Sequence, residues 1–298
     1  NPSPYFIENR TLLKKWLLEA ELPEGVDVRV GRWDIPGRPI VILVKFDGMY
    51  AVKDEFYGRM WQLYGVDSLH AYGDYDEACS FSHAAGIVAK SLFSFYKAHG
   101  LVSDRQKPRF ISHYDEWTTG MGLLYIKAEC PEAATVFTTH ATSIGRSICG
   151  NGKPLYDRLP YYNGDQMARE LNMESKHSLE KAAALQADCF TTVSEVTARE
   201  CGQLLGRRPD IVTPNGFENN FVPSASKFAD ARAAARSKML SVASSLTGHS
   251  FDDNTFIVVT SGRCEYRNKG IDLFLDSMTH MSYDNLDRPV LAFVMVPA

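Results

Sequence analysis

The segment 262–270 contains basic residues, two of which have the spacing of an anion site. It reads GRCEYRNKG and lies between a predicted strand and a predicted helix. Arg263 and Lys269 are six residues apart in it, just before the first turn of that helix. Backbone N–H groups and the helix dipole favour a bound anion at such a position. The segment therefore predicts a phosphate or diphosphate site, with a solvated basic loop as the alternative.

Polar side chains that can bind a ligand or take part in catalysis follow other predicted strands. In a parallel α/β sheet, ligands bind beyond the carboxyl ends of the strands. The residues at these positions are His113, Glu116 and Trp117, then His140 and Arg146, then Ser194 and Glu195, and finally Asn215. An arginine near His140 favours a functional role over that of a core histidine. Glu116 and Trp117 equally fit the start of a helix, and Asn215 with Gly216 fits a simple turn.

The elements that must position these residues alternate along the chain. Short β-branched runs predict strands at 26–30, 40–44, 110–113, 135–139, 189–193, 211–213, 256–260 and 290–296. Between them, helices are predicted at 11–19, 77–98, 117–127, 173–187, 194–205, 227–246 and 271–281. Strand followed by helix, repeated with apolar strands, predicts the α/β class with parallel sheets covered on both faces.

A turn-forming triplet, 214–216 (PNG), marks a domain boundary. We expect an N-terminal Rossmann-like domain at 1–216, a linker and connecting helix at 217–250, and a second domain that begins at 251–298. The last part holds a single β-α-β unit, below the ~50 residues of a small independent domain. The chain also starts without methionine and ends directly after an apolar strand. The expectation is therefore a nearly complete first domain and a truncated second one.

Composition excludes several classes of protein. The 298 residues are 45% hydrophobic and 23% charged, which excludes disordered, collagenous and disulfide-scaffold chains. The formal net charge is −4, so no overall field would recruit nucleic acid or an anionic membrane. No apolar run approaches the ~20 residues of a membrane helix. We therefore expect neither a nucleic-acid partner nor a membrane partner.

The six cysteines form no CxxC pair, so neither a zinc motif nor a redox motif is supported. Free thiols fit a reducing compartment, and we expect a cytoplasmic protein. The acidic pairs at 74–76 and 252–253 lack the spacing of a calcium loop, so no metal is expected. The GxSxG and Walker A motifs are also missing, which argues against serine hydrolases and P-loop ATPases.

Four segments closely resemble those of the animal and fungal type of glycogen synthase, glycosyltransferase family 3. They are 136–142 (VFTTHAT), 189–197 (CFTTVSEVT), 209–216 (PDIVTPNG) and 262–270 (GRCEYRNKG). Weaker matches are 31–33 (GRW) and 112–117 (SHYDEW). In the second of these, Asp115 stands where the family has another histidine, which puts any role of that imidazole in doubt. The resemblance runs in order over essentially the whole chain.

The resemblance implies a GT-B fold, in which two Rossmann-like, doubly wound parallel sheets face a cleft. It implies a retaining glucosyltransferase that moves glucose from a nucleotide sugar to the non-reducing end of an α-1,4-glucan such as glycogen. UDP-glucose is the expected donor, ADP-glucose is the alternative, and no cofactor or metal is expected. By the same resemblance, His140 and Arg146 would lie against the donor glucose and the acceptor side, and Asn215 would shape the sugar site. Arg263 and Lys269 would hold the donor diphosphate, and the expected substrate contacts also include His113, Glu116 and Trp117.

Two other interpretations stay open. The chain could be a catalytically inactive module for glucan binding or assembly, which the incomplete second domain would explain. It could instead be another GT-B enzyme, such as a phosphorylase or a sucrose-synthase-like glycosyltransferase. A phosphorylase would need a lysine for pyridoxal phosphate, and none can be located. A homo-oligomer is compatible with each of these interpretations.

Overall fold

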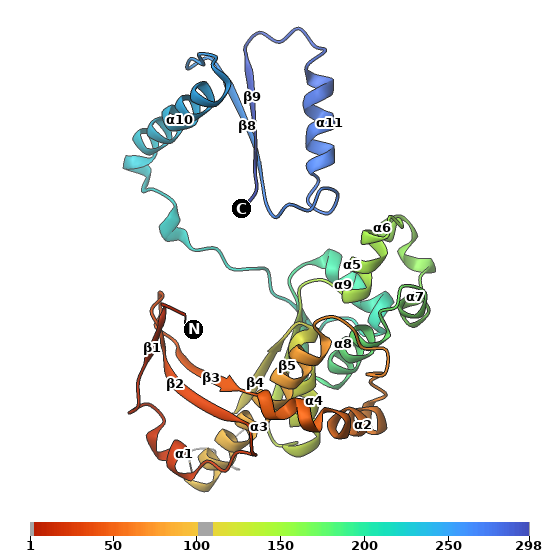
Figure 1. The fold of residues 1–298 in the computed structure, drawn as a ribbon. Helices are drawn as coiled ribbons and strands as arrows, with labels where there is room; N and C mark the ends of the chain where they lie inside the picture. Colours follow the sequence, from red (N-terminus) through yellow and green to blue (C-terminus); the bar gives the residue numbers. More distant parts are fainter. Residues whose placement is uncertain (1–2, 101–109, 298) are drawn as a thin grey trace. The chain divides into compact units, whose positions relative to one another are not determined.

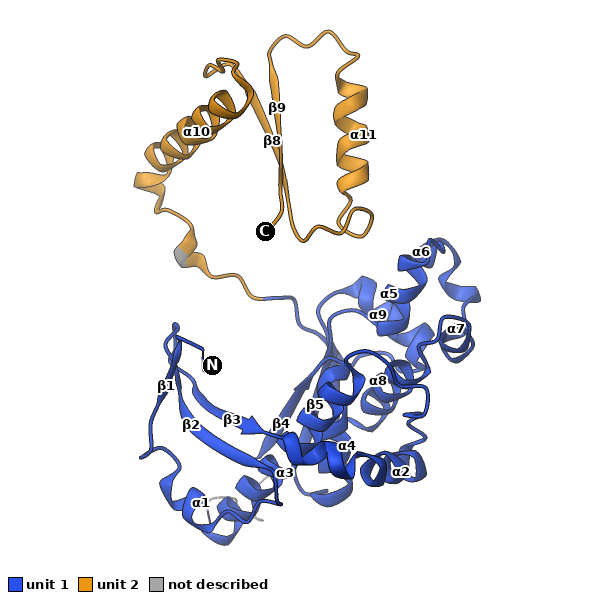
Figure 2. Ribbon diagram, viewed as in Figure 1, with its two compact units in different colours: residues 1–215 blue, residues 216–298 orange. Residues whose placement is uncertain are grey.

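The computed structural model describes residues 3–100 and 110–297, and the chain divides into two compact units. Unit 1 is Asn1–Asn215 and unit 2 is Gly216–Ala298 (Figure 2). Both units combine helices with parallel strands, which confirms the predicted α/β class. The assignment of the two parts to an acceptor-side domain and a nucleotide-binding domain stays a prediction. Among the described residues, no helix is both long enough and apolar enough to cross a membrane.

A four-stranded parallel sheet forms the centre of unit 1 (Figure 1). Its strands, in spatial order, are β4 (Ile111–Asp115), β5 (Ala134–Thr139), β6 (Cys189–Thr192) and β7 (Ile211–Val212). Phe137 pairs with Phe190 and Thr138 with Thr191, so β5 and β6 end at the same level. Phe137 and Phe190 are fully buried. Because the parallel strands end at the same level, the residues that follow them meet at one edge of the sheet. This edge carries the candidate site.

Helix α4 (Gly120–Glu129) packs against β4 and β5, and its first two turns are apolar. The side chains of Met121, Leu123, Leu124 and Ile126 are completely buried, as expected for a helix segment without a polar face. Gly122 lets α3 (Tyr75–Ala98) approach closely, because a Cβ there would lie 2.5 Å from the Ser82 carbonyl oxygen. The Gly122 N–H also donates to Ser82 Oγ at 2.7 Å. These contacts fix the start of α4 and with it the turn that follows β4.

The helices of the candidate-site region extend over slightly different ranges from those expected. The expected helix at 117–127 begins as a 3-10 turn, η2 (Trp117–Thr119), before α4. Helix α8 (Glu174–Gln186) is shorter than expected, and α9 (Glu195–Glu200) continues as a π-helical turn, η4 (Cys201–Leu205). The other expected helices of unit 1 are α1 (Lys14–Glu19) and α3.

Four helices of unit 1 were not expected from the sequence. They are α2 (Lys53–Tyr64), α5 (Ser143–Gly150), α6 (Leu155–Arg158) and α7 (Gly164–Glu170), and 3-10 turns lie at η1 (Asp47–Val52) and η3 (Leu159–Tyr161). Two short helices begin at side-chain caps, since Thr142 accepts from the Gly145 N–H and Asn163 from the Gln166 N–H. These caps were the available sequence signals. Ile144, Ile148 and Met167 join a second hydrophobic cluster that packs α5 to α7 together.

A second sheet of unit 1 is antiparallel, so the parallel arrangement predicted for the sheets does not extend to it. It comprises β1 (Phe6–Glu8), β2 (Asp27–Trp33) and β3 (Ile40–Lys45) in that spatial order. Only residues 34–39 connect β2 to β3, which is too short for the crossover that a parallel pair needs. Pro36 and Gly37 in this connection are the turn signal for a hairpin.

Unit 2 contains a β-α-β element preceded by a long helix. The parallel strands β8 (Phe256–Ser261) and β9 (Val290–Met295) are joined through α11 (Ile271–Met281), as the sequence predicted. A short turn, η5 (Asn219–Phe221), precedes α10 (Ala225–Thr247), which contains the expected helix at 227–246. Arg236 of α10 donates to the Asp253 carbonyl oxygen at 2.8 Å. This bond ties α10 to the segment that enters β8.

Candidate active site

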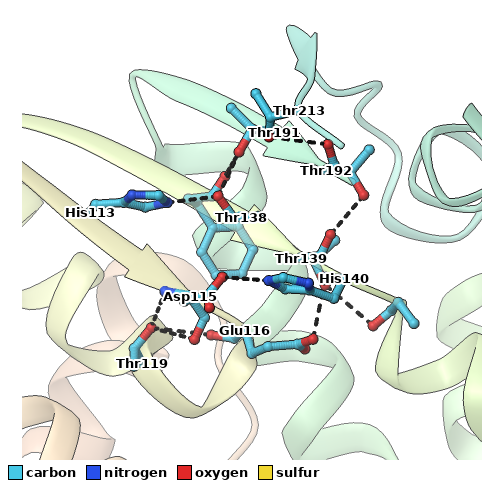
Figure 3. A network of polar contacts seen from close by, with 12 residues as sticks. His113, Asp115, Glu116, Thr119, Thr138, Thr139, His140, Thr191, Thr192 and Thr213 are labelled. Carbon is cyan, nitrogen blue, oxygen red and sulfur yellow. Dashed lines mark hydrogen bonds and ion pairs between the residues drawn. The ribbon is translucent and has the colours of Figure 1, made fainter. Parts of the chain in front are cut away.

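Threonine hydroxyls join the strands of unit 1 where their carboxyl ends meet (Figure 3). Thr138 Oγ1 and Thr191 Oγ1 lie 2.6 Å apart between β5 and β6. Thr192 Oγ1 donates to the Thr139 carbonyl oxygen at 2.7 Å. His113 of β4 lies beside the same network, with its Nε2 2.7 Å from Thr138 Oγ1. The Thr-Thr pairs of the two motifs therefore hold the strand ends in register.

His140 and two acidic residues form a cluster directly beyond this network (Figure 3). His140 Nε2 lies 3.1 Å from Asp115 Oδ1, and the His140 N–H donates to Glu116 Oε1 at 3.3 Å. Arg146 of α5 reaches the same carboxylate, with its guanidinium 3.6 Å from Glu116 Oε1. The structure therefore brings His113, Glu116, His140 and Arg146 to one edge of the sheet. It adds Asp115, which the sequence analysis noted only as a departure from the family pattern.

Glu116 has an unusual backbone conformation at the centre of this cluster. Its φ is 63° and its ψ is 167°, a region that only glycine populates readily. The surroundings enforce it, since the Glu116 N–H donates to the Thr138 carbonyl oxygen at 2.8 Å. Thr119 Oγ1 donates to the Asp115 carbonyl oxygen at 2.8 Å and closes the turn from the other side. Such backbone strain is concentrated at functional sites, where it aims a side chain.

The environment of the Glu116 carboxyl opposes its ionisation. Burial raises the pKa of Glu116, while the neighbouring Arg146 guanidinium and the His140 N–H lower it in part. The balance lies above the ordinary value, so protonation is easier than for a solvated glutamate. The cluster thus combines a carboxyl of raised pKa, a second carboxylate, an imidazole and a guanidinium. Together these groups can bind sugar hydroxyls and stabilise charge at a reacting carbon.

Replacing Glu116 with glycine is expected to leave the protein more stable than replacing it with alanine, by about 1 kcal/mol. Both changes remove the carboxylate, but only glycine relieves a backbone strain of about 1–3 kcal/mol. Glycine loses about 0.4–1 kcal/mol of this through its greater freedom in the unfolded chain. Urea unfolding of both variants measures the difference. At Arg232, an exposed position inside α10, the order should reverse, because helices favour alanine by ~1 kcal/mol. If the alanine variant were the more stable one at both positions, the inferred backbone strain at Glu116 would be contradicted.

Two buried carboxylates hold the loop that carries His140. Glu180 Oε1 accepts from Thr139 Oγ1 at 2.6 Å, and Glu180 Oε2 accepts from both the N–H and the hydroxyl of Ser143 at 2.7 Å. Glu200 Oε2 accepts from Thr142 Oγ1, the cap of α5, at 2.9 Å. The sequence analysis missed both glutamates. The polar residues that flank His140 in the motif were the only signal that its loop needs partners.

The ring of Trp117 packs against other side chains of unit 1. It stacks on the buried Tyr75, with ring centroids 6.0 Å apart and planes 6° apart. The Lys176 ammonium lies 4.6 Å from the centroid of the same ring and is bound to Asp74. These contacts favour the packing alternative given for Trp117. Its assignment as a substrate contact stays a prediction.

Asn215 lies at the end of unit 1, beyond β7, with an exposed side chain. No hydrogen bond of that side chain is recorded within residues 3–100 and 110–297. The backbone just before it is anchored, since the Thr213 N–H donates to the Thr192 carbonyl oxygen at 2.7 Å. Asn215 thus follows the same sheet edge without joining the cluster around His140.

Arg263 and Lys269 belong to unit 2, in the loop between β8 and α11. Arg263 Nε lies 2.9 Å from Glu265 Oε1, with the arginine side chain 66% exposed. The Lys269 stem passes Gly262, where an added Cβ would lie 3.8 Å from Lys269 Cδ. The loop therefore places its lysine over a residue without a side chain, at the start of α11. No ion pair of Lys269 is recorded in the part of the chain that the structure describes.

The described residues contain no group of three or more histidine, cysteine, aspartate or glutamate side chains that could hold a metal ion. Independence from metals and other cofactors stays an expectation.

Comparison with known proteins gives one consistent family. The family model for glycogen synthase matches residues 7–298. The chain is 31% identical to glycogen [starch] synthase isoform 1 of Saccharomyces cerevisiae, over 98% of the chain and 41% of that protein. It is 31% identical to the glycogen [starch] synthase of Neurospora crassa, over 95% and 40%. Identity to the liver glycogen [starch] synthase of Rattus norvegicus is 30%, over 94% and 40%. The chain thus spans about 40% of the length of these curated relatives.

Proposed function

Since the chain belongs to the glycogen synthase family, we propose that its protein is a retaining glucosyltransferase that extends glycogen. Glucose moves from a nucleotide sugar, UDP-glucose, to the non-reducing end of an α-1,4-glucan. The observation that carries the proposal is the cluster of Asp115, Glu116, His140 and Arg146 at the carboxyl edge of a parallel sheet, where this fold class binds its ligands. The three relatives described above are named as synthases, so a non-catalytic module is not favoured.

The cluster of unit 1 supports a role in sugar binding. The carboxylates of Asp115 and Glu116 accept hydrogen bonds from sugar hydroxyls, and His140 and Arg146 donate them. Glycosyl transfer develops positive charge at the anomeric carbon, and nearby carboxylates stabilise that charge. We assign His140 an orienting and electrostatic role, with the acceptor hydroxyl attacking on the face from which the phosphate leaves. The departing phosphate then takes the acceptor proton.

The loop of unit 2 supports a role in diphosphate binding. Departure of a nucleoside diphosphate develops negative charge on phosphate oxygens, which fixed cations stabilise without reorganisation. Lys269 supplies one such cation. Arg263 supplies another, because its exposed ion pair with Glu265 is worth little and yields readily to a phosphate. These two side chains can supply the stabilisation without a metal ion.

Ligand-induced stabilisation distinguishes the candidate donors. A ligand that binds only the folded state adds about 2.7 kcal/mol at a concentration of ~100 Kd. We expect UDP and UDP-glucose to raise the unfolding temperature of the protein and ADP to leave it nearly unchanged. The reverse order would replace UDP-glucose with ADP-glucose as the donor. Incubation with radiolabelled UDP-glucose and glycogen tests transfer itself, and the absence of both incorporation and stabilisation would refute the proposed function.

A further inference from the structure

Glu180 lies in the interior of unit 1, yet its carboxyl binds the loop next to His140. The side chain belongs to α8 and is completely buried. Its three hydrogen-bond donors come from Thr139 and Ser143, which lie on the two sides of His140 in the chain. A glutamate is almost never fully buried without a specific partner. Here the partner is the loop itself.

We propose that Glu180 is a positioning residue for His140, and that binding or release of one proton by its carboxyl changes how firmly the loop is held. The proposal rests on the proposed function for its link to glucosyl transfer. Its structural part is that the strength of the hydrogen bonds from the loop to Glu180 depends on the protonation of this carboxyl. That part rests on the contacts of Glu180 alone.

The hydrogen-bond geometry provides for both protonation states. In the ionised state, Thr139 Oγ1 donates to Glu180 Oε1 at 2.6 Å, and Ser143 donates twice to Oε2. When a proton from solvent binds Oε1, that oxygen becomes the donor and Thr139 Oγ1 the acceptor. The Thr139 hydroxyl hydrogen then turns to the Ala141 carbonyl oxygen, which lies 3.3 Å away. Protonation thus replaces the charge-assisted bond from Thr139 to the Glu180 carboxylate with weaker neutral bonds. Because Ala141 directly follows His140, this change takes place within the loop that carries His140.

The charge state of Glu180 is sensitive to pH near neutrality. Burial raises its pKa to about 7, although the hydroxyls of Thr139 and Ser143 favour the ionised form. The Glu116 carboxylate, from the turn after β4, raises the pKa further. Cys201 faces it from η4, and burial keeps that thiol protonated by raising the pKa of Cys201. Glu200, the other buried carboxylate of this region, binds Thr142 instead.

The direction of the pH effect follows from the raised pKa. Between the ordinary glutamate value of 4.5 and about 7, the folded protein keeps a proton that the unfolded chain has released. The contribution of Glu180 to stability is therefore complete below pH 4.5 and is lost as pH rises towards about 7. The ionised carboxyl, which forms the stronger hydrogen bonds to the loop, predominates only above about pH 7. We expect kcat to rise as Glu180 ionises.

Backbone NMR of the Ser143 amide tests the proposal independently of activity. In the unchanged protein, the Ser143 amide shift should titrate with a midpoint at about pH 7, because its N–H donates to the ionising carboxyl. Glu180→Gln keeps an acceptor but cannot ionise, so this titration should vanish. Glu200→Gln is the matched control, and the Ser143 titration should persist in it. A Ser143 amide that does not titrate, or that titrates unchanged in Glu180→Gln, would overturn the proposal.

Thr139→Val provides a second variant if Glu180→Gln does not fold. It removes the hydroxyl that favours the ionised form, so the Ser143 midpoint should move upward by about one pH unit or more. An unmoved midpoint would count against the exchange described above. Kinetics then test the link to transfer: the rise of kcat near neutral pH should be lost in Glu180→Gln and kept in Glu200→Gln. If the protein transfers no glucose at all, the proposed function fails. The NMR result still tests whether protonation of Glu180 changes its hydrogen bonds to the loop.

Discussion

Replacing Lys269 with alanine is expected to lower glucosyl transfer by on the order of 10²–10³-fold, the usual effect of removing one group that stabilises developing charge. The ammonium lies exposed at the start of α11, and no ion pair occupies it within the described ranges. It is therefore available to an incoming diphosphate. Its removal therefore breaks no ion pair among the described residues, and the free energy of unfolding should change by less than about 0.5 kcal/mol. Radiolabelled UDP-glucose and glycogen provide the transfer assay.

Lys238→Ala is the matched control for Lys269→Ala. Lys238 is an exposed lysine of the same unit, on α10 and outside the β8–α11 loop. Removing it changes the net charge equally, so transfer and UDP binding should stay within about twofold of the unchanged protein, as for an ordinary surface position. If the two variants lose activity to the same extent, the effect belongs to overall charge. Unchanged turnover in Lys269→Ala would refute the diphosphate assignment.

Replacing His140 with alanine should have an effect of similar size on kcat, about 10²–10³-fold, if its imidazole orients the donor and stabilises charge in the transition state. The change is specific to the ring, because the backbone N–H of residue 140 can still donate to Glu116. The contact between His140 Nε2 and Asp115 is lost, at a cost to stability of about 1 kcal/mol. Steady-state kinetics against UDP-glucose and glycogen separate kcat from KM. A rise in KM with kcat unchanged would indicate that His140 contributes to ground-state binding alone.

Two comparisons sharpen the His140 result. His280→Ala removes an exposed histidine of α11 whose Nδ1 lies 2.8 Å from the Asp276 carbonyl oxygen of the same helix, away from the cluster around His140 in the chain, so transfer should be preserved. Combining His140→Ala with Asp115→Ala measures the coupling of the pair. If the two side chains act as one unit, the double variant should be little worse than the worse single variant. Additive losses would show that Asp115 acts on the substrate separately.

Much of the fold could be predicted from local patterns. The β-branched runs at 135–139 and 189–193 correspond to β5 and β6, because short apolar segments bounded by turns and helices have few other stable states. The antiparallel pairing of β2 and β3 was not predicted, although Pro36 and Gly37 in their connection are typical of a hairpin turn. Helices α5 and α7 were missed because short helices depend on caps and packing more than on periodicity.

The candidate site was predictable in its residue types but not in its contacts. Placing polar residues at strand ends sufficed to select His113, Glu116, His140 and Arg146, which the parallel register brings to one edge. The pairing of His140 with Asp115 joins residues 25 positions apart. It depends on β4 and β5 ending side by side, a fact that no local pattern contains. Trp117 shows the opposite case, since its neighbours Tyr75 and Lys176 come from distant helices and occupy its ring.

By itself, the sequence determined the α/β class, the family motifs and the chemistry available at the strand ends. These follow from periodicity and residue type, which act over a few neighbouring positions. Only the tertiary structure decided which groups meet: Glu116 in a strained turn, and Glu180 buried beneath the loop of His140. Glutamate is ordinarily exposed, so its sequence context alone predicts a solvated face for α8. Burial and pKa arise from all the packed neighbours of a group, and most of those neighbours are distant along the chain.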